Sequence, residues 1–331
     1  MLGPKSVIYR ANAALITTLL VAMTPVSSAF AAQSQYSSTV QFLTDKFVGG
    51  KALDGFTAGT PDYGFTIEAM LQRKAGGQKL TDQMAAIRAT LADTTVSSKS
   101  ITAIYLYDTD KKIRPGLAGK FLFASAALGV PNAPLRNAVV TDLKSAITTA
   151  GSLIGNVGNS FDYSWAAMGL AAVGQTKLAN LVAIKLASLE RPDGGFGMDQ
   201  TGNAAVSSTD ATGISLQALA LCKRTASKTQ LVVEQNALLT GSKYLRSTEV
   251  TANHWESFGD LDVNGTAYAS MGLKAAGANV KTIQEWLKTR VAPAGGLTTP
   301  WSNGLGDVFA TAQGYTALIG MSYLDLLPVK K

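Results

Sequence analysis

Five aspartates give the clearest chemical signal in the sequence, because each stands at the start of a run that is poor in charge. They are Asp62, Asp162, Asp210, Asp262 and Asp307, and they recur at multiples of about fifty residues. Carboxylates that converge in a fold can act as general acid and general base, as in glycoside hydrolysis. A carboxylate in the first turn of a helix also caps that helix and is favoured by its dipole. The pattern by itself leaves catalysis, binding and capping open.

The elements that would position these aspartates are clearest around Asp210. Residues 177–189 place apolar side chains on one helical face, with Lys177 and Lys185 on the other. Pro192 and the glycines after it stop that helix and reverse the chain. Residues 211–222 then carry no charge and are apolar on every side, which is typical of a fully buried helix. The unit is an outer, half-exposed helix followed by an inner, buried one.

The same pair of helices recurs along the chain, which indicates a repeat protein. The segments expected to form inner helices are the one from residue 63, which Glu68 interrupts, and 121–128, 163–175, 211–222, 263–273 and 308–324. The segments expected to form outer helices are 40–47, 80–91, 135–147, 177–189, 232–245 and 280–291. Gly76, Gly129, Gly174 and Gly277 are expected to end apolar helices in the left-handed conformation.

Buried and half-exposed helices in alternation predict a closed double ring, that is, an all-α (α/α)6 toroid in a single domain over residues 33–331. An open solenoid would need polar terminal repeats, and neither end of the chain is unusually polar. Gly169, Gly213, Gly272 and Gly314 are expected to let the inner helices approach closely. Residues 98–110 fit a helix, a loop or a short strand.

Inner helices run parallel in such a ring, so the aspartates that open them meet at one end, which we call the rim. We expect a ligand to bind in the central cavity or at this rim. The expected ligand-binding residues are the five aspartates, the aromatics Tyr63, Phe65, Tyr163 and Trp165, and the interior residues Gln217, Tyr268 and Gln313. Trp255 and Trp301 are further rim candidates. For each residue, capping or ordinary packing is the competing hypothesis.

The stretch before Asp210 also resembles a known family. In LERPDGGFG, Glu190, Gly194 and Phe196 take the places of the Gln-x-x-x-Gly-x-Trp repeat of terpene cyclases and protein prenyltransferase β-subunits, and residues 249–255 hold a fainter copy. The following STDATGISLQALALC is similar to a helix-opening segment of cobalamin carriers of the intrinsic-factor type. These families share the (α/α)6 toroid, so the resemblance implies the fold more than the function.

The catalytic residues of those families do not carry over to this chain. Cyclases protonate their substrate with Asp-x-Asp-Asp, whereas residues 208–211 keep only Asp210. Prenyltransferases bind zinc through Asp, Cys and His, but Cys222 lacks the aspartate two residues earlier and His254 is the single histidine. A serine triad and a phosphate-binding glycine loop are also missing. We therefore expect no metal, no cofactor and no catalytic residues of these kinds.

Residues 1–32 have the parts of a secretory signal. Lys5 and Arg10 precede the apolar run 13–23, and Ala29-Phe30-Ala31 offers a small-x-small cleavage pattern. The run is shorter than the ~20 residues of a membrane span, so a retained anchor is the weaker alternative. Cys222 is the single cysteine, which rules out an intrachain disulfide. The net charge of +7 forms no basic cluster, so no nucleic acid partner is expected.

These observations favour a secreted, non-catalytic binding protein that takes a small or extended ligand. Whether a protein partner covers the ring is left open. The first alternative is a secreted toroid enzyme acting on a saccharide or an isoprenoid. In that enzyme two rim carboxylates, for example Asp162 and Asp210, would act as acid and base. The second alternative is a cobalamin-type carrier, although the chain lacks the second domain with which those carriers cover the corrin.

Overall fold

The structure is a computed structural model that describes residues 36–47, 49, 52–80, 83, 105–108, 110–130, 133–154, 159–198, 207–251 and 253–328. The expected signal, residues 1–32, lies outside the described residues. So do most of the predicted outer helix 80–91 and most of the ambiguous segment 98–110. No helix in the described part of the chain is both long enough and apolar enough to cross a membrane.

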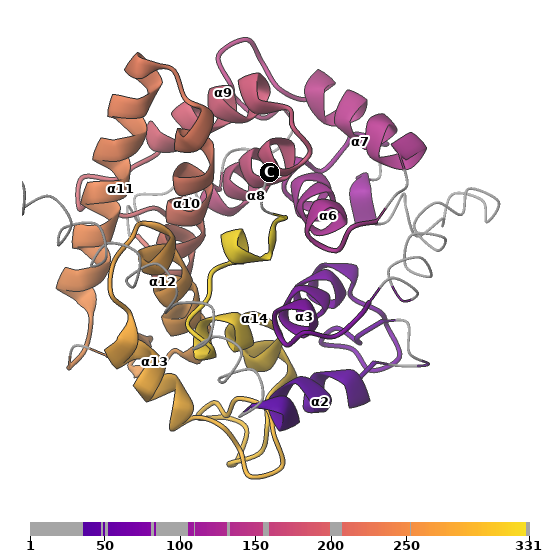
Figure 1. The fold of residues 1–331 in the computed structure, drawn as a ribbon, viewed down its shortest axis with the longest axis vertical. Helices are drawn as coiled ribbons and strands as arrows, with labels where there is room; N and C mark the ends of the chain where they lie inside the picture. The colour runs from indigo at the N-terminus through magenta and orange to yellow at the C-terminus, as the bar shows by residue number, and fades with distance from the viewer. Residues whose placement is uncertain are drawn as a thin grey trace, which may run out of the picture.

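Within the described residues, six inner helices form a closed ring (Figure 1). They are α3 (Tyr63–Ala75), α6 (Pro115–Ala127), α8 (Ser160–Ala172), α10 (Thr209–Cys222), α12 (Val263–Ala275) and α14 (Val308–Leu318). Each packs against the next, and α14 packs against α3. Every residue of α10 from Ala211 to Cys222 is buried, as its uncharged sequence predicted. A helix with neighbours on all sides keeps apolar residues on all sides.

The outer helices surround this ring (Figure 1). Within the described residues they are α2 (Ser37–Asp45), α7 (Ala133–Ser145), α9 (Thr176–Ala187), α11 (Lys228–Thr248) and α13 (Lys281–Lys288). α7 packs on α6, whereas α9 packs between α8 and α10, and α11 packs mainly on α10 with a smaller contact to α12. α2 and α13 also contact two inner helices each. The alternation along the chain confirms the predicted all-α toroid.

Close approach between inner helices depends on glycine. A Cβ atom at Gly169 would overlap the backbone carbonyl of Gly119, and one at Gly272 would overlap that of Gly213. α6 therefore meets α8, and α10 meets α12, nearly backbone to backbone, which confirms the expectation for three of the four predicted glycines. Gly314 is different, because a Cβ there would meet a leucine side chain from a loop rather than a helix backbone.

Several helix ends differ from the prediction, and three of them have a clear cause. α6 begins at Pro115 rather than at residue 121, because glycines that read as helix breakers are needed for its contact with α8. α14 ends at Leu318 rather than at residue 324, since Gly320 adopts a φ of 73°. Gly76 has a φ of −75°, and it is Gly77 that takes the left-handed conformation, with a φ of 81°.

The last described segment enters the centre of the ring (Figure 1). It contains the short helix η3 (Tyr323–Leu326). The fully buried Tyr323 accepts a hydrogen bond from Gln72 Nε2 at 3.1 Å and packs against Trp165 and Tyr268. Its backbone N–H donates to Gln217 Oε1 at 2.9 Å. Part of the expected central cavity is thus filled by the chain itself.

Candidate functional site

One structural device repeats at the rim. The residue four positions after the helix cap accepts a hydrogen bond from the backbone N–H of a buried residue in the preceding loop. The threonine acceptors are Thr66, Thr212, Thr266 and Thr311, at donor distances of 2.8 to 3.0 Å. In α8 the Tyr163 hydroxyl does the same for Leu153 at 3.1 Å. This device holds the rim loops over the inner helices and fixes the register of each repeat.

Three of the five predicted aspartates are helix caps in this register. Asp62, Asp262 and Asp307 are the N-cap residues of α3, α12 and α14. Their carboxylates accept from the backbone N–H three residues later, at 2.9, 2.7 and 2.8 Å respectively. Each cap is followed four residues later by one of the threonines. Capping accounts for the place of these three carboxylates in the repeat.

The other two aspartates do not occupy the N-cap position of their helices. Asn159 caps α8 and Ser208 caps α10, so that Asp162 and Asp210 lie inside the first helical turn. Both are half-buried, and their helices pack side by side. The Asp210 carboxylate accepts from the N–H of Ala211 at 2.8 Å. The helix dipole favours an acid at either position, but neither acid is the cap of its helix.

Asp162 and Asp210 face different neighbours. A Cβ at Gly116 would overlap the Asp162 carboxylate, so this acid lies against the first turn of α6. Asp210 interacts electrostatically with Asp262 at the start of α12. Burial raises the pKa of Asp262, the charge of Asp210 raises it further, and the hydrogen bond from Gly265 opposes both. The pKa of one carboxyl is therefore raised beside a second carboxylate, an arrangement that suits acid–base chemistry.

The predicted aromatic residues lie at two depths. Tyr63 and Phe65 are half-buried at the rim, where Tyr63 contacts Tyr105 edge to face. Tyr163 and Trp165 are buried, and the Trp165 ring lies inside the ring of helices. Trp255 is also buried, and its indole N–H donates to a backbone carbonyl at 3.1 Å. Of this set, only Tyr63 and Phe65 are placed to contribute ring surface at the rim.

Exposed aromatics on the rim loops were mostly missed by the sequence analysis. Phe56 is 88% exposed and stacks on Phe309, with ring centroids 4.6 Å apart, while Phe65 packs edge-on against Phe309. Trp301 lies in the loop before α14 and is 77% exposed. Phe258 is exposed in the hairpin of β1 (Glu256–Ser257) and β2 (Asp260–Leu261) before α12. The available signal was a large aromatic residue in a loop otherwise rich in Gly, Thr, Asp and Asn.

Two of the three predicted interior residues, Tyr268 and Gln313, belong to a buried polar network centred on Glu68. Its carboxylate accepts from Tyr268 Oη at 3.1 Å and from Gln313 Nε2 at 2.8 Å, and it pairs with Lys120 Nζ at 2.6 Å. Gln217 is apart from this network, beside Tyr323. Glu68 and Lys120 were not predicted as site residues, although the single acid of α3 and the single charged residue of α6 could have suggested a buried ion pair.

No group of three or more His, Cys, Asp or Glu side chains that could hold a metal ion occurs among the described residues. Cys222 is fully buried, and burial raises the pKa of its thiol well above the ordinary value. A high thiol pKa disfavours the thiolate that a nucleophile or a metal ligand requires.

Comparisons with known proteins give a fold likeness alone. No protein-family model matches the chain, and no curated protein matches it significantly. Among solved structures, an unsaturated glucuronyl hydrolase from Streptococcus agalactiae aligns with a TM-score of 0.55 and 13% identity over 96% of this chain and 98% of that one. The unsaturated glucuronyl hydrolase from Bacillus sp. GL1, described as responsible for the degradation of glycosaminoglycan, aligns with a TM-score of 0.54 and 13% identity over 88% and 94% of the two chains.

A third alignment is to a structure designated UGL, an Asp-to-Asn variant with dGlcA-Glc-Rha-Glc, at a TM-score of 0.53 and 14% identity. It covers 88% of this chain and 94% of that chain. These likenesses agree with the (α/α)6 toroid predicted from the sequence. The cyclase and prenyltransferase resemblance is supported only in its toroid part.

Proposed function

We propose that this chain is an enzyme that hydrolyses a saccharide at the rim of the toroid, with Asp210 and Asp262 as the reacting carboxyl groups. The observation that carries the proposal is the out-of-register position of Asp210, whose charge helps raise the pKa of Asp262. The fold likeness to saccharide-acting hydrolases favours this enzyme, the first alternative of the sequence analysis, over a non-catalytic binding protein.

The roles follow from the difference in environment between the two carboxyls. Asp262, with its raised pKa, would donate a proton to the glycosidic oxygen as the bond breaks. Asp210 would remove a proton from the attacking water, so that one proton is delivered and one is taken up in each turnover. Asp162, on the adjacent helix, would orient the sugar by accepting hydrogen bonds from its hydroxyls.

The chain itself supplies a matched control. Asp62 and Asp307 occupy the same cap position in their repeats as Asp262 does, and asparagine is nearly as good a cap as aspartate. Asp62→Asn and Asp307→Asn should therefore keep both fold and activity. Asp210→Asn and Asp262→Asn should stay folded but lower kcat by roughly 10²- to 10⁴-fold, the usual contribution of a general acid or base.

The assay should offer a panel of saccharides, including unsaturated glucuronyl disaccharides and neutral oligosaccharides, and follow release of the reducing end. Turnover by the wild-type protein that is lost in Asp210→Asn but retained in Asp307→Asn is the expected result. Failure of the wild-type protein to cleave any member of the panel while still binding one would favour the binding protein instead. Equal activity of all four variants would remove these carboxylates from the mechanism.

Export is part of the same proposal, since residues 1–32 have the form of a secretory signal. N-terminal sequencing of protein recovered from the culture medium should give a start near Ala32 or Gln33. A secreted product that still begins at Met1 would contradict cleavage.

A further inference from the structure

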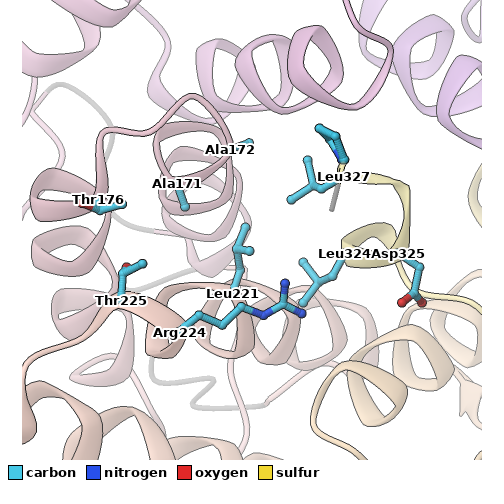
Figure 2. A pocket seen from close by; sticks show the side chains of 10 residues that line it. Ala171, Ala172, Thr176, Leu221, Arg224, Thr225, Leu324, Asp325 and Leu327 are labelled. Carbon is cyan, nitrogen blue, oxygen red and sulfur yellow. The ribbon is translucent and has the colours of Figure 1, made fainter. Parts of the chain in front are cut away.

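A cavity lies at the end of the ring away from the rim. Figure 2 shows the side chains that line it. The cavity has a volume of about 550 Å³ and is bounded by the C-terminal ends of α8 and α10 and by the last described segment. This size falls within the range of about 300 to 1,000 Å³ that is usual for small-molecule sites. The cavity shares none of its lining residues with the rim site proposed above, so the inference made here does not rest on the proposed function.

The walls of this cavity are largely apolar. Leu221 comes from α10, and Leu324 and Leu327 come from the last described segment (Figure 2). On the α8 side the lining residues are Ala171 and Ala172, whose short side chains leave the space open. Water gains few hydrogen bonds against such walls, so an apolar ligand that displaces it is favoured.

The edge of the cavity carries a positive charge. Arg224 belongs to the short helix η2 (Lys223–Thr225) that follows α10, and its side chain extends across the cavity towards Leu324 (Figure 2). Its side chain is exposed, and no hydrogen bond or salt bridge to it is found among the described residues. A basic residue just after a helix also favours the helix dipole, but that role does not require a position over a hollow.

The one carboxylate among the lining residues, that of Asp325, is occupied by hydrogen bonds from a residue in the same turn. Asp325 Oδ2 accepts from the N–H and the hydroxyl of Ser322, at 2.8 and 3.0 Å. In Figure 2 its carboxylate points away from the leucines. Arg224 is thus the charged group of the lining that is available to a ligand, and guanidinium pairs readily with carboxylate through paired hydrogen bonds.

We propose that this cavity binds a single-chain amphiphile with a carboxylate head group, of the fatty-acid class. The carboxylate pairs with Arg224, and the hydrocarbon chain lies against Leu221, Leu324 and Leu327. Charge complementarity selects an acid over an alcohol or an amine, and the volume suits one chain rather than the two of a membrane lipid.

The test is calorimetric titration of the full chain with dodecanoate, below the concentration at which dodecanoate forms micelles. Dodecanol and dodecyltrimethylammonium serve as ligands with the same chain and a different head group. Dodecanoate should bind at one site, and the other two should bind at least tenfold more weakly, because only the carboxylate can pair with Arg224. Absence of dodecanoate binding, or equal binding of all three compounds, would overturn the proposal.

Two variants and one control identify the site. Arg224→Gln should weaken dodecanoate binding by about tenfold or more and leave the thermal midpoint unchanged, because its side chain is exposed. Ala172→Phe should fill the cavity and abolish binding. Lys228→Gln is the matched control, since it removes an exposed cation nearby in the sequence that does not line the cavity. Binding that is unchanged in both Arg224→Gln and Ala172→Phe would place dodecanoate elsewhere and refute the site.

Discussion

Two buried glutamates in this molecule meet opposite conditions. Glu68, on the inner helix α3, accepts from Tyr268 and Gln313 and pairs with Lys120. Glu234, on the outer helix α11, is equally buried, but neither of its carboxylate oxygens has a hydrogen-bond donor among the described residues. Burial raises the pKa of Glu234 to about 7, although the nearby charge of Lys223 opposes the shift.

The difference shows that burial alone does not decide what a carboxylate does to the fold. At the centre of the ring, three donors from three other inner helices converge on Glu68, so that its charge joins the helices together. Between α10 and α11, the ionised form of Glu234 lacks such compensation and is costly. Burial raises the pKa of Cys222, and the negative charge of Glu234 raises it further. We therefore expect the stability of the contact between α10 and α11, rather than that of the ring centre, to change as the pH passes through neutrality.

The largest effect is expected from placing a new unpartnered carboxylate in the inner ring. Leu219→Asp introduces a charge at a position that is fully buried in α10. It should lower the free energy of unfolding by about 4 kcal/mol or more, which is enough to unfold many domains. Val232→Asp is the matched control, because Val232 is exposed on α11. Urea denaturation followed by circular dichroism measures both, and similar small losses would contradict the burial of α10.

Removing the cation from Glu68 should give the next largest effect. Lys120→Met keeps the length of the side chain but leaves the carboxylate without its counter-charge, at an expected cost of about 3 to 5 kcal/mol. Lys185→Met, which removes a half-exposed cation from the outer helix α9, should change the free energy of unfolding by less than about 0.5 kcal/mol. If the two variants unfold at the same urea concentration, the ion pair does not hold the ring centre together.

The pH response of Glu234 provides a test with a defined sign. The folded-state pKa of about 7 lies above the ordinary value of 4.5, so protonation favours the folded state. The stability that this provides is fully present below about pH 4.5 and is lost as the pH rises through about 7. Glu234→Gln removes this loss, and we expect the variant to be more stable than wild type by on the order of 1 to 3 kcal/mol at about pH 8.

At about pH 4 the Glu234→Gln variant and the wild-type protein should have nearly equal stability, because Glu234 is then protonated in both states. Glu285→Gln is the matched control, because the Glu285 side chain is 55% exposed on α13, and it should leave the free energy of unfolding nearly unchanged. A constant difference between Glu234→Gln and wild type from acid to alkaline pH would show that the carboxylate finds a partner.

The smallest effect on stability is expected at a carboxylate that is half-exposed and already accepts a hydrogen bond. Asp307→Asn replaces the cap of α14, whose carboxylate accepts from the N–H of Ala310 at 2.8 Å. The thermal midpoint should fall only slightly, corresponding to about 1 kcal/mol or less, since asparagine caps a helix nearly as well. A loss as large as that of Lys120→Met would assign this aspartate a role beyond capping.

Periodicity in the sequence was enough to predict the architecture. The run without charge in α10 reflects a helix with neighbours on all sides, and the pattern of α9, with one apolar and one polar face, reflects a helix that is buried on one side. Helix ends were less predictable, as the early start of α6 shows. Gly116 and Gly119 have low helix propensity, and only their contacts with α8 explain why they lie within a helix.

The candidate site could be predicted only in part. The sequence placed the five aspartates near the starts of inner helices, but it could not separate the caps from Asp162 and Asp210. That distinction depends on where each helix begins relative to its loop, which the bonds to Thr66 and its counterparts fix. The fold also brings Asp210 close enough to Asp262 to act on its pKa, and sequence spacing does not reveal such proximity.

By itself, then, the sequence determined the helical repeat, the inner and outer roles of its helices and their closure into a ring, because burial follows from the period of apolar residues. The tertiary structure decided which polar side chains meet. Glu68 and Gln313 are 245 residues apart in the chain and 2.8 Å apart at their nearest side-chain atoms. Ring closure brings them together, and the partners that each charge then finds depend on the geometry of the whole ring rather than on any local pattern.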